Sequence, residues 1–256
     1  MKKLVYDKKY KTHFCYDPLA YDVVERYARD NFFKFTHKTP QEVENIVIVG
    51  GYHGNEIDIY NSLYPNANIF VFEPHPRHFP ALNQRYGNRS NVFLYKKAVS
   101  SETGQTTFYD VSGEGQSSLL RFQGHEFGST THLVGNMQVE TIRLDDVKEL
   151  KNKKIDFMQV DVQGGELLVL EGAKKTILNT DALMLECHTE QHVHPADKEP
   201  YKNQCYLPDL INYFKNNENN IRCHTVGLDN EYNNGQGNSF WHRIDDPQRY
   251  FSGEIK

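Results

Sequence analysis

Polar side chains able to take part in acid–base or metal chemistry gather in one short stretch, Glu186 to His194. The imidazole of His188 titrates near neutrality, which suits a general base that removes the proton of an attacking group. A lone histidine can equally be structural, so this role has a plain alternative. His188, His192 and His194 with Glu186 would also suit a divalent metal, because imidazole and carboxylate groups are common metal ligands. Their spacing matches no established zinc motif, and we therefore predict no resident metal.

A second candidate group follows a short apolar segment. Asn68 to Phe72 is typical of a buried strand, and Glu73 comes directly after it, 19 residues beyond Gly54. In α/β folds that bind nucleotides, an acid at this place accepts hydrogen bonds from both ribose hydroxyls. The alternative is an acid that only caps the helix that follows.

A glycine-rich turn ends the apolar segment before it. Ile46 to Val49 is β-branched and typical of a buried strand, and it stops at Gly50 and Gly51, with Gly54 soon after. Glycine lets the backbone approach a ligand closely, and the start of the following helix offers free N–H groups. The pattern predicts a nucleotide-binding turn, although a tight turn without a ligand has the same sequence.

The segments that would position these residues alternate between strands and helices. Strands are predicted at 46–49, 68–72, 92–95, 106–110, 138–144, 155–160, 182–185, 221–226 and 239–244. Helices are predicted at 17–34, 55–64, 76–86, 167–175 and 207–217. This alternation is typical of a doubly wound α/β sheet with right-handed crossovers. The ligand site of such a sheet lies at the carboxyl ends of its strands. We therefore expect four groups to meet there: the turn from Gly50 to Gly54, Glu73, Asp161, and Glu186 with His188.

The segment from Val111 to Gly135 is long, glycine-rich and serine-rich, and it contains Gln116-Ser117-Ser118-Leu119. A loop of this length inside a compact domain is usually functional or disordered. We predict that it closes over a bound cofactor and acceptor.

Composition and charge exclude several classes of protein. With 256 residues, 38% hydrophobic and 25% charged, the chain can form one large domain with a full core. The net charge of −5 gives no basic surface for nucleic acid. No apolar run approaches the roughly 20 residues of a membrane span, and the N-terminus lacks the apolar core of a signal peptide. The four cysteines are scattered, which predicts reduced thiols and a cytoplasmic protein.

The predicted domain organisation has two parts. Asp17-Pro18 is typical of a helix start, and the apolar residues after it fall at helical spacing. We predict an N-terminal helical extension, residues 1–44, packed on a main domain of residues 45–256. The oligomeric state is not predicted.

Several of these motifs follow one another in a particular order. They are Val49–Gly54, Val71–Pro76, Lys97–Ser100, Ser117–Leu119, Thr141–Asp146, Ile155–Gly172 and Leu185–His188. In order and spacing they resemble the FkbM-type methyltransferases, within the class I S-adenosylmethionine-dependent enzymes. The most specific block begins at Ile155 and runs through Asp161 to Glu166.

The resemblance implies a Rossmann-like sheet of seven strands, mostly parallel with the last one antiparallel, and helices on both faces. It implies methyl transfer from S-adenosylmethionine to a hydroxyl group, and we expect the acceptor to be a glycan or a glycosylated small molecule. His188 and Asp161 are the catalytic candidates, and the family position of Asp161 favours a cofactor or active-site contact. The cofactor-binding residues it implies are Gly50, Gly51, Tyr52, His53, Gly54, Glu73, Pro74, Ala98, Val99, Ser117 and Asp161.

This chain departs from the family pattern at three places. Ile48 replaces an acid that usually precedes the first glycine by two residues, and Gly51-Tyr52 replaces Ala-Asn. Gln163 replaces the usual glutamate after the fourth strand. These departures predict a differently wired cofactor site, and they leave open a non-catalytic module that binds a cofactor or a glycan.

A nicotinamide-dependent dehydrogenase is the other enzyme class considered. Its Gly-x-Gly-x-x-Gly turn would need glycine at Val49, so the match fails where the turn is tightest.

Overall fold

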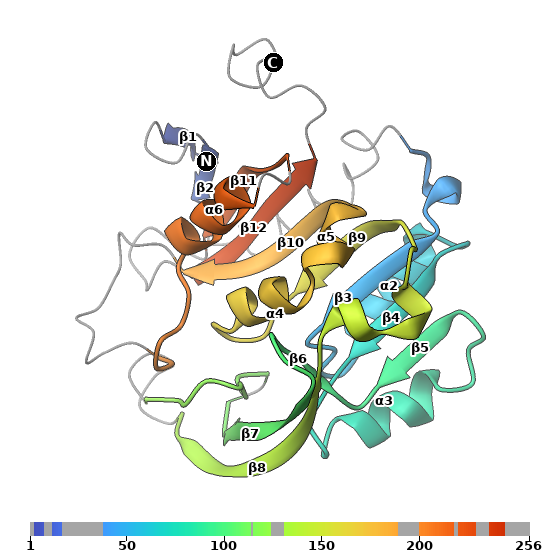
Figure 1. Cartoon of the computed structure of the whole chain (residues 1–256), viewed down its shortest axis with the longest axis vertical. Helices are drawn as coiled ribbons and strands as arrows, with labels where there is room; N and C mark the ends of the chain where they lie inside the picture. Colours follow the sequence, from blue (N-terminus) through green and yellow to red (C-terminus); the bar gives the residue numbers. More distant parts are fainter. Residues whose placement is uncertain are drawn as a thin grey trace.

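The structure is a computed structural model that describes residues 3–7, 12–16, 38–113, 115–123, 131–188, 200–217, 220–228 and 236–243. A twisted nine-stranded sheet runs through the molecule, and a smaller three-stranded sheet lies beside it (Figure 1). Together the two sheets position the residues predicted to form the site.

Five parallel strands form the centre of the large sheet. They are β3 (Asn45–Val49), β4 (Asn68–Phe72), β5 (Val92–Tyr95), β9 (Ile155–Val160) and β10 (Thr180–His188). Strand β12 (Gln236–Arg243) runs antiparallel to β10, and β11 (Ile221–Leu228) runs antiparallel to β12. The order β11-β12-β10-β9-β3-β4-β5 confirms the predicted sheet of seven mostly parallel strands with one antiparallel strand.

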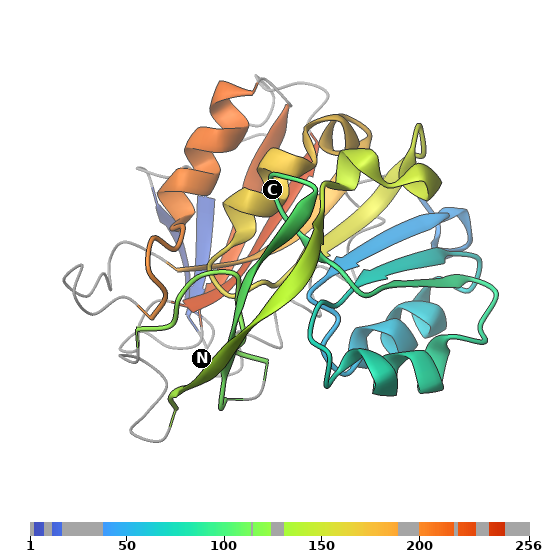
Figure 2. The same ribbon diagram turned by 60° about the horizontal axis from the view of Figure 1, so that its bottom comes forward.

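Helices cover both faces of this sheet, as predicted for a doubly wound fold. The crossover helices of the first half are α2 (Asn55–Leu63) and α3 (Phe79–Tyr86). Those of the second half are α4 (Glu166–Gly172), α5 (Lys174–Leu178) and α6 (Leu207–Asn216). In Figures 1 and 2 the second set lies on one side of the sheet and α3 on the other.

The pleat of β4 shows why this sequence forms two cores. Successive side chains of a strand point to opposite faces. Ile69 and Val71 pack with α2 and α3, while Phe70 and Phe72 pack with the helices of the opposite face. A strand buried on both sides therefore has no polar alternation, which explains the continuous apolar runs in the sequence.

Two strands that the sequence did not predict extend the sheet at one edge. Strands β1 (Lys3–Asp7) and β2 (Thr12–Tyr16) form an antiparallel pair, and β2 pairs in parallel with β11. The predicted helix at 17–34 lies outside the described residues, so the extension of residues 1–44 as a separate helical unit stays a prediction.

The small sheet joins β6 (Ala98–Val99), β8 (Leu133–Ile142) and β7 (Gly104–Val111). Strands β7 and β8 pair along most of their length and form a ribbon that projects from the large sheet (Figure 2). Both strands are longer than predicted, so Val111 and the segment from Leu133 belong to strands and not to the predicted loop. Short 3₁₀ turns occur at Pro40–Glu42, Leu144–Asp146 and Lys148–Leu150.

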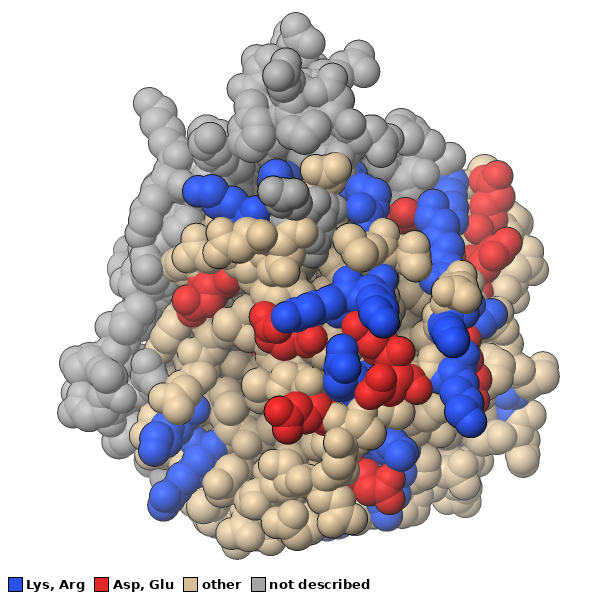
Figure 3. Space-filling model, viewed as in Figure 1, with Lys and Arg blue, Asp and Glu red and all other residues tan. Residues whose placement is uncertain are grey.

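The described surface has mixed charge. Figure 3 shows Lys and Arg side chains interspersed with Asp and Glu over one face. Ion pairs such as Lys97–Glu140, with 2.8 Å between Nζ and Oε2, are typical of it. Within the described ranges, no helix has the length and apolar character needed to cross a bilayer.

Candidate active site

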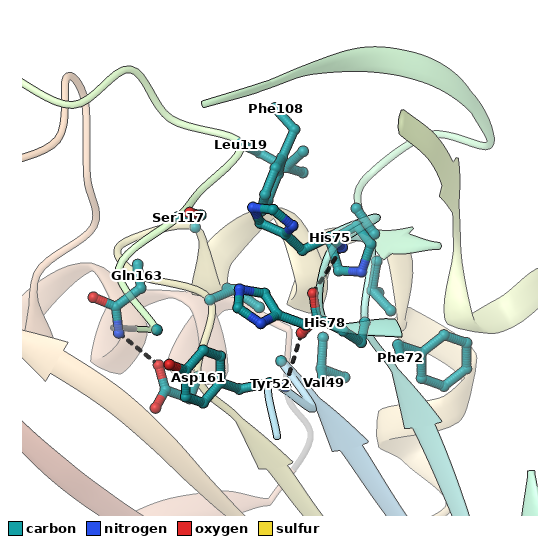
Figure 4. A pocket seen from close by; sticks show the side chains of 18 of the residues that line it. Val49, Tyr52, Phe72, His75, His78, Phe108, Ser117, Leu119, Asp161 and Gln163 are labelled. Atoms are coloured by element: carbon teal, nitrogen blue, oxygen red, sulfur yellow. Dashed lines mark hydrogen bonds between the residues drawn. The ribbon is translucent and has the colours of Figure 1, made fainter. Parts of the chain in front are cut away.

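A cavity of about 440 Å³ opens at the carboxyl ends of β3, β4, β9 and β10. Figure 4 shows Asp161, Gln163 and Ser117 on one side of it and His75 and Phe72 on the other. The residues that line it are Val49, Gly50, Tyr52, Glu56, Phe72, Glu73, Pro74, His75, His78, Ala98, Val99, Phe108, Gly115, Gln116, Ser117, Leu119, Gln159, Asp161, Val162, Gln163, Gly165 and Glu186. The strand ends expected to meet at one crevice therefore do so.

The glycine turn forms the floor of the cavity next to β9. Gly50 has φ of 91°, and a Cβ built on it would lie 1.8 Å from the carbonyl oxygen of Asp161. A Cβ on Gly51 would lie 2.5 Å from a methyl group of Val71. Gly54, with φ of 78°, is the N-cap of α2. Only glycine fits these positions, because two need a left-handed backbone and all three face close neighbours.

Not every predicted residue of this turn reaches the cavity. Gly50 and Tyr52 line it, whereas Gly51, His53 and Gly54 are outside its lining. The His53 ring stacks on the Tyr52 ring with 3.8 Å between centroids, so it supports the wall from behind. Gly51 and Gly54 contribute by allowing the tight conformation of the turn.

Glu73 projects into the cavity from the end of β4. One carboxylate oxygen accepts the N–H of Tyr52 at 2.8 Å, and the other accepts the N–H of His75 at 2.7 Å. Burial raises the pKa of Glu73 to about 7, and these two hydrogen bonds oppose the rise. Each oxygen of an ionised carboxylate can accept a second hydrogen bond, so Glu73 can still receive two hydroxyl donors.

An imidazole pair that the sequence analysis did not select forms the wall beyond Glu73. His75 Nδ1 accepts the N–H of Arg77 at 3.1 Å, which leaves Nε2 to donate to Asp110 at 3.2 Å. Burial, followed by the nearby imidazoles of His75 and His53, lowers the pKa of His78 to about 4. His78 is therefore neutral at pH 7. The sequence feature that could have indicated His75 is Glu73-Pro74-His75, in which the histidine closely follows the end of a predicted strand.

The small sheet, the segment after β7 and the residue after Glu73 supply the remaining predicted contacts. Ala98 and Val99 of β6 line the cavity, as do Pro74 and Ser117. The Ser117 hydroxyl accepts the N–H of Val111 at 3.1 Å, which ties the segment after β7 to that strand. The described part of the predicted loop thus forms a wall of the cavity.

Two carboxylates and one carboxamide form the opposite wall. Gln163 Nε2 lies 2.7 Å from Asp161 Oδ1 and 2.7 Å from Glu186 Oε2. Asp161 follows β9, and Glu186 belongs to the neighbouring strand β10, so the carboxamide bridges two strand ends. Of these three, sequence reasoning selected only Asp161 as a site residue. Glu186 was expected at the same crevice, but its only predicted role was that of a possible metal ligand, and Gln163 was noted only as a departure from the family.

His188, the predicted base, does not line the cavity formed by the described residues. It is 4% exposed and lies near Tyr206, with 6.5 Å between the ring centroids. Within the described ranges, no group of three or more His, Cys, Asp or Glu residues could hold a metal ion. His192 and His194 lie outside those ranges.

The cavity fits the cofactor that the fold implies. The bare Gly50 backbone leaves room for a ligand against β3, and Glu73 offers a carboxylate only 6% exposed for a pair of hydroxyls. Both are features of nucleoside sites in open α/β sheets. Gly50, Tyr52, Glu73, Pro74, Ala98, Val99 and Ser117 could therefore hold it.

Comparison with known proteins agrees with this fit. The methyltransferase FkbM domain matches residues 49–217. The 2-O-methyltransferase NoeI of Sinorhizobium fredii is 29% identical over 175 residues, which are 65% of this chain and 69% of NoeI. The hexuronic acid methyltransferase AglP of Haloferax volcanii is 29% identical over 133 residues, about half of each chain.

Among solved structures, Aeropyrum pernix fibrillarin in complex with S-adenosylmethionine has 12% identity and a TM-score of 0.47. That alignment covers 84% of this chain and 74% of fibrillarin. FkbM-domain proteins are S-adenosylmethionine-dependent methyltransferases. Because the domain match spans well over half of the sequence, the chain belongs to the FkbM methyltransferase family.

Proposed function

We propose that this protein is an O-methyltransferase that transfers a methyl group from S-adenosylmethionine to a hydroxyl group of a sugar or of a glycosylated small molecule. The observation that carries the proposal is one cavity with a nucleoside-type wall on one side, Gly50 and Glu73, and two carboxylates, Asp161 and Glu186, on the other. The names of NoeI and AglP describe methyl transfer at a 2-O position and to a hexuronic acid, and these activities support a sugar acceptor.

The cofactor-side residues have separate roles in this proposal. The Glu73 carboxylate accepts the two ribose hydroxyls, and the Gly50 turn leaves room for the rest of the cofactor. When bound, S-adenosylmethionine supplies an electrophilic methyl group and leaves as S-adenosylhomocysteine. The main task of the chain is then to align the acceptor oxygen with that methyl carbon and to exclude water.

The acceptor hydroxyl is a weak nucleophile and gains from a base that takes its proton as the new carbon–oxygen bond forms. We assign this role to Asp161, because its carboxylate lines the cavity and Gln163 fixes its orientation. His188 remains the other candidate. It lies two residues after Glu186, which also lines the cavity, and the two assignments differ in a measurable way.

The acceptor and the cellular compartment are part of the same proposal. We place the reaction in the cytoplasm, where free thiols persist. Among the cysteines with described side chains, Cys187 and Cys205 are buried free thiols. Nucleic acid is not the proposed acceptor, since the net charge of −5 would oppose it.

Calorimetry with S-adenosylmethionine, S-adenosylhomocysteine and NAD tests the cofactor. We expect the first two to bind and NAD to give no heat. Transfer of a labelled methyl group to sugar acceptors then tests the reaction. Binding without any transfer would favour a non-catalytic module, and binding of NAD alone would favour a dehydrogenase.

A further inference from the structure

The carboxamide of Gln163 has an unusual set of partners. Its nitrogen contacts Asp161 Oδ1 and Glu186 Oε2, both at 2.7 Å. Ionised carboxylates only accept hydrogen bonds, so both hydrogens of the carboxamide are donated to acids. The Tyr201 hydroxyl lies 3.4 Å from the carboxamide oxygen and donates to the Gln116 carbonyl at 2.6 Å. The two hydrogen bonds at the nitrogen therefore fix the orientation of the Gln163 side chain.

The backbone around Gln163 is built to hold that side chain in place. Gln163 has φ of 58°, a left-handed conformation that a residue with a side chain seldom adopts. The Ser118 hydroxyl lies 2.9 Å from the Gln163 carbonyl oxygen and 3.1 Å from that of Val162. The buried Glu166 carboxyl accepts the N–H groups of Val162 and Gly164, both at 3.2 Å. Strained residues of this kind persist where their surroundings over-determine them, typically at functional sites.

The charge of the cavity is one-sided. Four of its lining residues are acids, Glu56, Glu73, Asp161 and Glu186. Among the lining residues that the structure describes, none is Lys or Arg. Burial keeps His78 neutral at pH 7, because the pKa of His78 is lowered to about 4. A carboxylate or phosphate on the acceptor would meet like charges here, which disfavours its binding.

Two acids next to each other usually repel, and Gln163 offsets part of that repulsion by donating one hydrogen to each. Both acids line the cavity, and a carboxylate there suits the hydroxyl donors of a sugar ring, because it only accepts hydrogen bonds. A glutamate at position 163 would replace both donated hydrogens with a third negative charge. In this chain Gln163 thus bridges Asp161 and Glu186 without adding a charge.

We propose that Asp161, Gln163 and Glu186 form the acceptor subsite, that Gln163 is its positioning residue, and that the subsite selects a neutral, hydroxyl-bearing sugar over an acidic one. This inference rests on the proposed methyl transfer and narrows its acceptor. According to this inference, a hexuronic acid, the acceptor class in the name of AglP, is not the preferred acceptor of this chain.

The test uses the full chain, tritiated S-adenosylmethionine and a panel of methyl hexosides, each paired with the hexuronide that differs only in the carboxylate at C6. We expect transfer to the neutral member of a pair to exceed transfer to the acid by about tenfold or more. Equal or better transfer to the hexuronides would overturn the inference. So would the absence of transfer to every neutral member by a protein that binds S-adenosylhomocysteine.

Two variants test the role of Gln163 itself. Gln163→Glu should lower kcat/KM for a neutral acceptor by about tenfold or more, mainly through KM, while the Kd of S-adenosylhomocysteine changes less than twofold. Gln163→Met, which removes the donors without adding charge, should show a smaller loss. Gln84→Glu adds the same charge on the exposed side of α3 and serves as the matched control.

An unchanged KM in Gln163→Glu would overturn the positioning role. Failure of the wild-type chain to bind S-adenosylhomocysteine would overturn the proposed function together with this inference. Normal binding of S-adenosylhomocysteine together with equal or better transfer to the hexuronides would overturn this inference but leave the proposed function standing. If either variant fails to fold, the comparison of hexosides with hexuronides still tests the acceptor preference, because it uses the wild-type chain.

Discussion

The Cα atom of Gly50 faces the carbonyl oxygen of Asp161 so closely that a Cβ added to Gly50 would lie 1.8 Å from that oxygen. The Asp161 N–H also donates to the Val49 carbonyl at 3.0 Å. The end of β3 and the end of β9 are therefore in direct backbone contact at the centre of the cavity. The cofactor side and the acceptor side share this contact, so a disturbance of one side reaches the other.

Replacing Gly50 with alanine should damage both sides at once. The added methyl group clashes with rigid backbone, and φ of 91° is strained for alanine. We expect Gly50→Ala to weaken S-adenosylhomocysteine binding by more than tenfold and to lower Tm by several degrees. Calorimetry and thermal melts measure the two effects. Gly104→Ala is the control, since a Cβ there meets nothing within 4 Å; equal behaviour of the two variants would contradict the prediction.

Cofactor affinity should depend on pH through Glu73. The charged carboxylate is the better acceptor for hydroxyl donors, and burial raises the pKa of Glu73 to about 7. Affinity for S-adenosylhomocysteine should therefore fall by about tenfold between about pH 8 and about pH 6, and be constant above pH 8. Calorimetry at several pH values measures it. Glu73→Gln should bind weakly and without this dependence, so a pH profile that survives the substitution would exclude Glu73 as the cause.

Proton transfer can be assigned by comparing two variants. If Asp161 takes the acceptor proton, Asp161→Asn should lower kcat by roughly a hundredfold or more. His188→Ala should then cost less than about tenfold, because its imidazole lies outside the cavity lining. Steady-state kinetics with saturating S-adenosylmethionine measures both, and circular dichroism checks folding. The reverse ranking would assign the proton to His188.

Folding stability should carry a signature of the buried Glu166. Burial raises the pKa of Glu166 from 4.5 to about 7. Between these values the folded chain holds a proton that the unfolded chain has released. This contribution to the free energy of unfolding is fully present below pH 4.5 and is lost as the pH rises to about 7.

Glu166→Gln keeps an oxygen for the N–H groups of Val162 and Gly164 but cannot ionise. Relative to this variant, the wild type should lose on the order of 3 kcal/mol of stability between about pH 4 and about pH 8. Urea unfolding at both pH values measures the difference. A pH-independent difference would mean that Glu166 ionises normally. Relative to Glu166→Gln, Glu166→Ala should be destabilised by about 2 to 4 kcal/mol at either pH, because it leaves two buried N–H groups without an acceptor.

Activity should survive a chelator. Among the described residues no metal-binding group occurs, and the proposed chemistry needs only alignment and a base. Treatment with EDTA followed by dialysis should leave kcat unchanged. Loss of activity that zinc or magnesium restores would instead make Glu186, His188, His192 and His194 candidate ligands.

Elements whose burial is set by local pattern could be predicted from the sequence. The continuous apolar run of β4 marks a strand that is buried on both faces. The residue directly after such a strand lies at the edge of the sheet, and this located Glu73. The strands β1 and β2 were missed for the opposite reason. Their partner is β11, near the other end of the chain, and no local pattern reveals a pairing over that separation.

The candidate site divides in the same way. The role of Gly50 could be predicted because the end of an apolar strand at a glycine is visible in neighbouring residues of the sequence. The bridge from Gln163 to Glu186 was not, because it needs adjacent strands and one side-chain rotamer across 23 residues. The contact of His75 with Asp110 spans 35 residues and joins the two sheets. Single residues could be found from the sequence, whereas the pairs that give them chemical roles required the fold.

The pairing of β2 with β11 has a consequence for how the chain is made. Ile221–Leu228 is synthesised roughly 200 residues after its neighbour Thr12–Tyr16, which at about 5 to 20 residues per second means a delay of at least about 10 s. The central strands can pair during that interval, but β2 cannot pair with β11 until Ile221–Leu228 has been synthesised. Strands β1 and β2 are therefore made before the central strands and join the sheet after them, and until then their open edge is a surface for chaperones or for another nascent chain.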